Sequence, residues 1–208
     1  MQGTSVRNQD TAKKGMLIVS CVPSLLTMVS PEQERRDILA RLNRAVELLA
    51  GAMDVRLIPP AGCNIAFATH HARDGRNIAS VTGGIVVRDG KIFPSGPCAF
   101  DTGADISRVV LTTMKFDAEM RSAAVIRYSP EALHQLADMS IACCGIDRSK
   151  EPPGISTMDW GIASCCSDGV PDVIYDRESQ KSSGVIYLIG EDVVGVASTI
   201  IILSHRIQ

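Results

Sequence analysis

A chain of 208 residues is long enough for one sizeable hydrophobic core with a small appendage. A formal net charge of −2 and an aromatic content of 4% argue against a nucleic-acid binder that works through general electrostatics or base stacking. No apolar run approaches the length of a membrane span, so we expect a cytoplasmic protein that makes no membrane contact.

Residues 1–29 differ in character from the rest of the chain. Residues 1–15 are polar and are expected to be disordered. Residues 16–29 are apolar and follow Lys13-Lys14, which loosely resembles a secretory signal. Pro23 interrupts this run and no clear cleavage site follows it, so an extra strand or a helix lying on the domain is the better interpretation.

The first regular element is predicted to be a helix that begins at Ser30 and ends at Gly51. Ser30 suits the N-cap, Pro31 the first turn, and Gln33 completes a capping box. After this helix we expect a turn into a strand over 57–68, followed by a glycine-marked strand over 80–87. Asp89-Gly90 then predicts a hairpin turn.

The stretch from Val109 to Pro130 forms the centre of the chain. Apolar residues at helical spacing predict an amphipathic helix from about residue 106 to 114, and the run 123–126 predicts a buried strand. Beyond it we predict a helix over 131–139, a strand over 140–146, a helix over 156–166 and strands over 170–176 and 185–189. The last segment, 193–203, reads as a helix or a strand.

Interleaved helices and strands predict one α/β layered domain over 30–208, and the hairpin at Asp89-Gly90 predicts that its sheet is mixed. The seven cysteines include two adjacent pairs, at 143–144 and 165–166, without zinc-ligand spacing. We therefore expect small buried hydrophobes in a reducing cytoplasm, with a reactive thiol at Cys63 as the alternative.

Ligands of α/β domains tend to lie beyond strand ends, where several polar residues of this chain are found. Lys115, Arg127, Asp147-Arg148 and Asp176 therefore suggest one shared cleft that suits a phosphate. Each also has a plainer interpretation, namely a solvated turn, an exposed strand end or an ordinary turn aspartate. Asn64 could bind a ligand or satisfy the backbone of its own turn.

Five phrases occur in an order that resembles the ThiN-type thiamine-phosphate synthase family. They are RLIPPAGCNIAFA, VVLTTMKFDAEMRSAAVIRYSPE, GIDRSKEP, MDWGI and GVPDVIYD. The resemblance covers roughly 35–203 and implies a three-layer α/β/α fold with a mixed sheet, similar to the class II aldolase fold and usually dimeric. Active members join hydroxymethylpyrimidine diphosphate to thiazole phosphate and release pyrophosphate.

By motif position, the resemblance implies that seven residues line the ligand pocket: Asn64, Lys115, Asp117, Arg127, Asp147, Arg148 and Asp176. It also identifies a departure. Active members carry an arginine and a histidine at the places held here by Gly84 and Asp105. Because such contacts are typically worth about 3 kcal/mol each, their loss should slow the reaction by orders of magnitude. His70 or His71 is a possible substitute.

Two functions follow from the resemblance. The first is a ligand-binding module that holds thiamine phosphate or a phosphorylated precursor, with weak or lost catalysis, and acts as a sensor. The second is an active transferase whose missing groups come from elsewhere, such as the partner in a homodimer. We expect no tightly bound cofactor, no dedicated metal site, and Mg²⁺ only if the protein is active. A structural partner without a ligand is a third interpretation, which the retained cationic residues disfavour.

Overall fold

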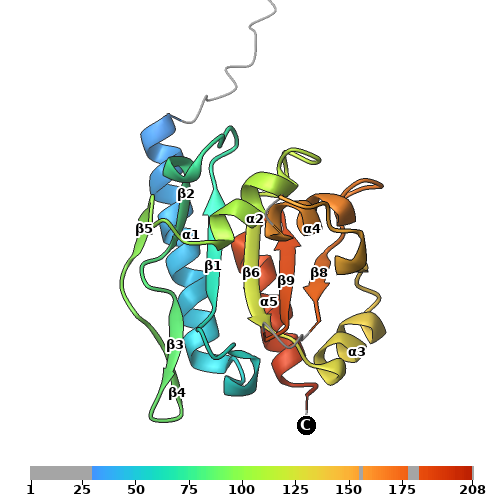
Figure 1. Ribbon diagram of the computed structural model, residues 1–208. Helices are drawn as coiled ribbons and strands as arrows, with labels where there is room; N and C mark the ends of the chain where they lie inside the picture. Colours follow the sequence, from blue (N-terminus) through green and yellow to red (C-terminus); the bar gives the residue numbers. More distant parts are fainter. Residues whose placement is uncertain (1–29, 155–156, 178–182, 208) are drawn as a thin grey trace, which may run out of the picture.

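The computed structural model describes residues 30–154, 157–177 and 183–207 (Figure 1). The helices are α1 (Pro31–Ala52), α2 (Ile106–Thr113), α3 (Pro130–Asp138), α4 (Thr157–Cys165) and α5 (Val193–Ser204). The strands are β1 (Asn64–Ala68), β2 (Ile78–Val81), β3 (Ile85–Arg88), β4 (Lys91–Pro94), β5 (Cys98–Phe100), β6 (Ser122–Arg127), β7 (Cys143–Gly145), β8 (Val173–Asp176) and β9 (Val185–Gly190). The expectations for residues 1–29 lie outside the described residues.

Seven of these strands form one mixed sheet in the order β5-β2-β1-β6-β9-β8-β7. Every neighbouring pair is antiparallel except β7 and β8, which run parallel. The sheet is therefore mixed as predicted, but not for the predicted reason. The hairpin at Asp89-Gly90 forms as expected, with positive φ at both residues, yet its strands β3 and β4 make a separate two-stranded sheet.

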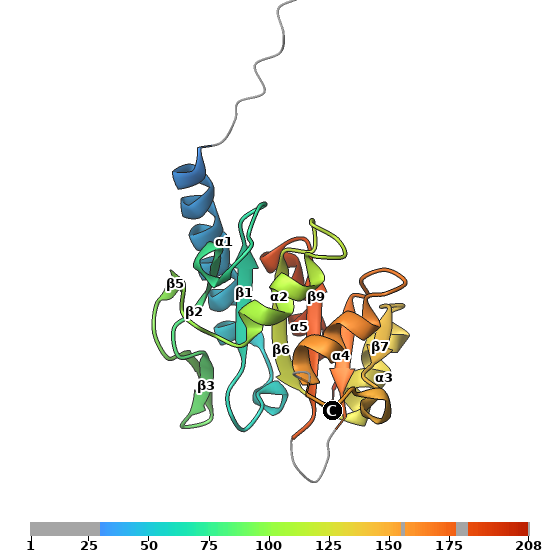
Figure 2. The same cartoon turned by 45° about the horizontal axis from the view of Figure 1, so that its top comes forward.

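Helices cover both faces of the large sheet, which gives three α/β/α layers. Figure 2 shows α2 and α4 in front of the sheet and α1 and α5 behind it. Strand alternation divides the core accordingly: Ile65, Ala124 and Ile186 pack toward α1 and α5, whereas Ala66, Ala123 and Ile174 pack toward α2 and α4. The predicted three-layer fold with a mixed sheet is confirmed.

The first helix forms largely as its sequence predicts. The Ser30 hydroxyl accepts a hydrogen bond from the Gln33 amide at 3.2 Å, and the helix buries one apolar face that includes Leu42 and Leu49. Gln33 does not close the capping box, because its side chain donates to Asp37 instead. Helix α5, ambiguous in the sequence, packs against α1 behind the sheet, with Ala197 and Ile200 buried.

The predicted strand over 80–87 is in fact two strands. Gly83 and Gly84 both adopt positive φ, at 72° and 76°, which few residues other than glycine tolerate. The chain turns there, so β2 stays in the large sheet and β3 leaves it for the hairpin. A Cβ at Gly84 would lie 2.8 Å from the Cys63 carbonyl oxygen, so this corner excludes any side chain unless the backbone shifts.

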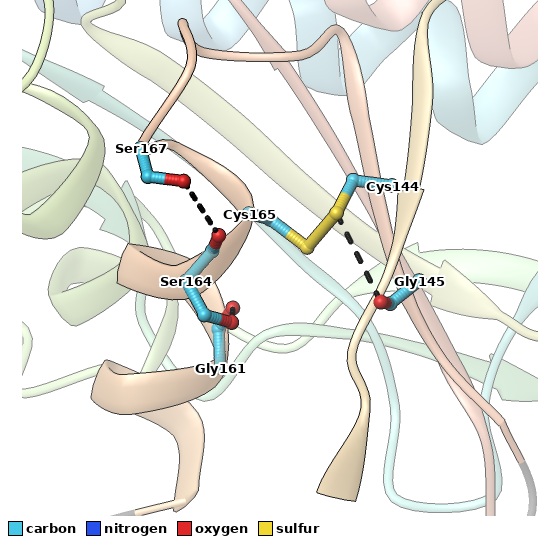
Figure 3. The surroundings of a disulfide bond; sticks show 6 residues. All are labelled: Cys144, Gly145, Gly161, Ser164, Cys165 and Ser167. Atoms are coloured by element: carbon cyan, nitrogen blue, oxygen red, sulfur yellow. Dashed lines mark hydrogen bonds between the residues drawn. A yellow bond between two sulfur atoms is a disulfide. The ribbon is translucent and has the colours of Figure 1, made fainter. Parts of the chain in front are cut away.

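A disulfide joins Cys144 of β7 to Cys165 of α4 (Figure 3). The expectation of seven reduced cysteines is therefore wrong for these two, because each adjacent pair contributes one partner to a bridge between elements. The sequence separation is 21 residues, and closing a loop of that size restricts the unfolded chain by roughly 3 kcal/mol. The bridge fixes an edge strand to the helix that covers it.

Candidate functional site

One end of the large sheet gathers most of the polar residues that the sequence singles out. At this end β1 begins with Asn64, β6 ends with Arg127 and β8 ends with Asp176 (Figure 1). In the register, Val185 of β9 pairs with both Arg127 and Asp176, so those two residues lie two strands apart, or ~10 Å. Strand alternation puts all three on the α2/α4 side. We call this region the arginine edge.

The strongest polar contact at the arginine edge is the pair between Arg148 and Asp176. The guanidinium donates from Nε to Oδ1 at 3.0 Å and from its terminal nitrogen to Oδ2, which makes the contact bidentate. Asp176 is 12% exposed and Arg148 is 39% exposed, so the carboxylate is covered while the cation still faces solvent. The Asp176 carboxylate raises the pKa of Arg148 above its ordinary value, so the guanidinium stays charged. Asp176 lies at the end of β8, and both of its carboxylate oxygens accept hydrogen bonds from Arg148.

Arg127 adds a second guanidinium to the same edge. It is exposed at the end of β6, as the plainer interpretation has it. It also borders a hollow of about 430 Å³, whose lining residues Leu57 and Ile207 belong to the α1/α5 side of the core. Arg127 ends β6 and Arg148 follows β7, so both lie at the same end of the sheet although β9 and β8 separate the two strands. Both residues are exposed.

Tyr187 of β9 lies two residues further into the sheet than Val185, which pairs with Arg127 and Asp176 at this edge. Burial, with the nearby charges of Asp176 and Asp105, raises the pKa of Tyr187 to about 12, although Arg148 opposes the shift. The phenol therefore stays protonated at neutral pH. It donates a hydrogen bond to the Met158 sulfur at 3.7 Å, which ties the strand to α4.

Asn64 uses its side chain to hold the neighbouring strand. Its Nδ2 donates to the Val81 carbonyl at 3.0 Å, and its Oδ1 accepts from the Val81 and Ile65 amides at 3.1 and 2.8 Å. This amide thus braces the corner that contains Gly84. A Cβ at Gly84 would lie 3.9 Å from Asn64 Nδ2, so the two positions adjoin each other at the arginine edge.

Asp105 directly precedes α2 and makes no side-chain capping hydrogen bond. The carboxylate of Asp105 therefore does not satisfy the amides of the first helical turn. Its charge is close enough to contribute to the raised pKa of Tyr187. One turn further along α2, Arg108 pairs with Asp159 of α4 at 2.5 Å, which holds the two covering helices together.

Asp147 follows β7 at the same end of the sheet, but its carboxylate contacts only residues close to it in the sequence. Its Oδ1 accepts hydrogen bonds from the Ser149 amide at 3.1 Å and the Ser149 hydroxyl at 2.6 Å, and Lys150 lies 3.3 Å from its carboxylate. These contacts, led by the Ser149 hydroxyl, lower the pKa of Asp147. Asp147 caps the short 3₁₀ helix η3 (Arg148–Lys150), and so fixes the backbone from which the Arg148 side chain extends.

Lys115 and Asp117 do not join this group. Both are exposed in the turn between α2 and β6, at the opposite end of the strand from Arg127 (Figure 1). Lys115 instead borders a hollow of about 390 Å³ with His70 and His71. The prediction of one cleft that includes Lys115 is therefore wrong, and His70, which pairs with Glu34 at 2.7 Å, is too far away to replace a group at the arginine edge.

The hypothesis of a reactive thiol at Cys63 is also wrong. Cys63 is 5% exposed, and burial raises the pKa of its thiol to about 12. Its amide and carbonyl pair with Ile85, so this residue anchors the start of β3. Among the residues that the structure describes, no three His, Cys, Asp or Glu side chains gather in a way that could hold a metal ion.

Comparison with known proteins identifies the fold and its relatives. The family model described as thiamine-phosphate synthase ThiN matches residues 41–202. The chain belongs to the ThiN family. The bifunctional thiamine biosynthesis protein ThiDN of Methanocaldococcus jannaschii is 32% identical over 80% of this chain, and thiamine-phosphate synthase ThiN of Methanothermobacter thermautotrophicus is 26% identical over 76% of it.

The ThiN match corresponds to part of one relative and most of the other. The matched region spans 40% of the length of ThiDN and 88% of the length of the Methanothermobacter ThiN. The crystal structure of the C-terminal domain of a phosphomethylpyrimidine kinase superimposes with a TM-score of 0.76 and 30% identity, covering 82% of this chain and all of that domain. The chain thus has the architecture of a ThiN domain.

Sequence reasoning missed one residue of the arginine edge, Tyr187. The alternation of Val185, Tyr187 and Ile189 in β9 assigns all three to one face, but the pairing of β9 with β8, which brings the phenol near Asp176, could not be read from this pattern. None of the helices in the described residues combines the length and apolarity needed to cross a bilayer.

Breaking the Arg148–Asp176 pair should destabilise the fold more than breaking an exposed pair. Arg148→Met leaves a mostly buried carboxylate without its partner, and we expect a loss of about 1–3 kcal/mol in the free energy of unfolding. Lys150→Met, which breaks the exposed pair with Asp147, is the matched control and should cost less than about 1 kcal/mol. Equal losses in urea titrations of the two variants would contradict this account.

Tyr187 should ionise late, which makes stability depend on pH in the alkaline range. The unfolded phenol ionises near pH 10 and the folded one at about 12, so the stabilisation is full below pH 10 and falls as pH rises toward 12. The difference in tyrosinate absorbance between the wild type and Tyr187→Phe isolates this group. A difference titration centred near pH 10 would show that Tyr187 is not shielded.

Proposed function

We propose that this ThiN domain binds thiamine phosphate, or one of its phosphorylated pyrimidine or thiazole precursors, at the arginine edge, without joining the precursors at an enzyme-like rate. The observation that carries the proposal is that Arg127, at the end of β6, and Arg148, held by Asp176 at the end of β8, lie at the same end of the sheet. Guanidinium groups are well suited to phosphate, because their fork of donors matches its oxygens.

The expected lack of catalysis rests on Gly84 and Asp105. By family resemblance, active members carry an arginine and a histidine at these places, where they would stabilise a departing pyrophosphate. Gly84 supplies no cation, and its positive φ and the nearby Cys63 carbonyl leave no room for a side chain. Asp105 adds a negative charge near Tyr187, which opposes a pyrophosphate there. The domain would therefore hold a ligand and report its presence to a partner, as a sensor subunit does.

A second candidate, an active synthase, is favoured by one comparison. A relative named thiamine-phosphate synthase ThiN aligns over 88% of its own length. In that case hydroxymethylpyrimidine diphosphate and thiazole phosphate would give thiamine phosphate and pyrophosphate, with Mg²⁺ on the diphosphate, and the missing groups would come from a second copy of the chain. A homodimer is part of this candidate and is compatible with the first.

Thermal melting measures binding directly. Thiamine phosphate at a hundred times its dissociation constant should add about 2.7 kcal/mol to the unfolding free energy, which raises Tm by roughly 5–10 °C for a chain of this size. Arg127→Met combined with Arg148→Met should abolish the shift. Lys115→Met removes a positive charge at the other end of the sheet and should retain the shift. An unchanged shift in the double variant would refute binding at the arginine edge.

Incubation of the protein with both precursors and Mg²⁺ separates the two candidates. We expect no thiamine phosphate beyond a trace after many hours, because two electrostatic contacts are missing. Turnover near the usual enzymatic range of 1–10³ s⁻¹ would establish the second candidate instead. The assay is repeated across protein concentrations, since groups supplied by a second copy would make the rate per chain rise with dimer formation.

A further inference from the structure

The Cys144–Cys165 bridge connects two elements that meet at the arginine edge. β7 has only three residues and ends the sheet order, with hydrogen bonds to β8 on one side. Ile146, Asp147 and Arg148 follow it directly, so the position of this short strand determines the backbone position from which the Arg148 side chain extends. A strand with so few hydrogen bonds depends on further contacts to stay in place.

On the other side of the bridge, α4 holds the remaining groups of the edge. Met158 accepts the hydrogen bond of Tyr187, and Asp159 pairs with Arg108 of α2. In the sheet register, Cys144 pairs with Ile174, which pairs with Tyr187, so the bridge and the phenol lie in one row on one face. The disulfide therefore closes a ring of contacts that runs from β7 through α4 to β9.

Close packing supports the same connection. A Cβ at Gly161 of α4 would lie 2.7 Å from the Ile146 Cδ1, so the helix backbone already touches the residue that leaves β7. The Ile146 amide donates to the Tyr175 carbonyl at 2.9 Å. A shift of β7 relative to α4 would thus be passed through Ile146 to Arg148, two residues later.

The bridge is within reach of a reagent, and neighbouring thiols do not compete for it. Cys144 and Cys165 are both partly exposed. Cys143 points to the opposite face of the strand, where its thiol donates to the Ile141 carbonyl at 3.3 Å, and Cys166 is 1% exposed in the core. Burial raises the pKa of both thiols, and Asp172 adds to the shift of Cys143, so neither is a ready nucleophile at neutral pH.

We infer that Cys144–Cys165 is a thiol–disulfide exchange site whose oxidation state sets the order of Arg148 at the arginine edge. The part that concerns ligand affinity rests on the proposed function. A thiolate of a dithiol reductant attacks one bridge sulfur, forms a mixed disulfide and releases the other cysteine, which takes a proton. The second thiol of the reductant then displaces the first cysteine, so two electrons pass to the protein and the reductant leaves as a cyclic disulfide.

Peptide mapping and hydrogen exchange test the inference without any ligand. A digest of the oxidised protein should contain a cross-linked pair of peptides with Cys144 and Cys165, which dithiothreitol separates. Reduction should speed exchange in residues 143–150 by roughly tenfold or more and leave β1 unchanged. The same rates in both states, or the absence of the cross-linked pair after oxidation, would overturn the inference.

Variants provide the matched controls. Cys144→Ser with Cys165→Ser should exchange like the reduced wild type in either redox state, whereas Cys143→Ser should retain the full response to dithiothreitol. If the double variant does not fold, the reversible change of the wild type between oxidised and reduced forms carries the test by itself.

A binding measurement with thiamine phosphate distinguishes this inference from the proposed function. Reduction should weaken binding by roughly fivefold or more in the wild type and have no effect on the double variant. If exchange responds to reduction but neither form binds, the proposed function fails and the exchange site stands. If both forms bind equally and exchange does not respond, the redox inference fails and the proposed function stands.

Discussion

The bidentate contact between Arg148 and Asp176 is the interaction on which the arginine edge depends. A guanidinium held by a covered carboxylate stays charged and pointed in one direction, so little side-chain entropy is lost when an anion arrives. Three separate features maintain the pair. Asp147 caps the turn that starts at Arg148, and β8 ends at Asp176. The Cys144–Cys165 bridge holds β7, the strand that leads into Asp147 and Arg148.

Much of this architecture follows from local rules. The Ser30-Pro31 start of α1, the Asp89-Gly90 hairpin and the apolar run of β6 were predictable because capping, turn chemistry and periodicity act over a few residues. The predictions that failed did so for different reasons. Lys115 precedes β6 and Arg127 ends it, so the predicted strand already implied that the two residues lie at its opposite ends, and the shared cleft was a wrong interpretation of that pattern. Cys144 and Cys165, by contrast, are joined only by the packing of α4 on β7.

Two positions carry the argument about activity. Gly84 is required by the corner that sends β3 out of the sheet, because its φ is positive and the Cys63 carbonyl occupies the space of a side chain. A cationic side chain therefore could not replace Gly84 without a shift of the backbone at this corner. Asp105, whose side chain makes no capping hydrogen bond, adds negative charge near Tyr187, whereas Arg127 and Arg148 supply positive charge at the rim. Under the proposed function, this distribution of charge would favour a phosphate at the rim over a pyrophosphate deeper in.

The most direct test of the central claim is a crystal of the oxidised protein soaked with thiamine phosphate. The account predicts density for the phosphate within hydrogen-bond distance of the Arg148 guanidinium, with Arg127 turned toward it and the Arg148–Asp176 pair intact. Density for the ligand beside Lys115 and His71 at the other end of β6, with the arginine edge unoccupied at full saturation, would contradict it.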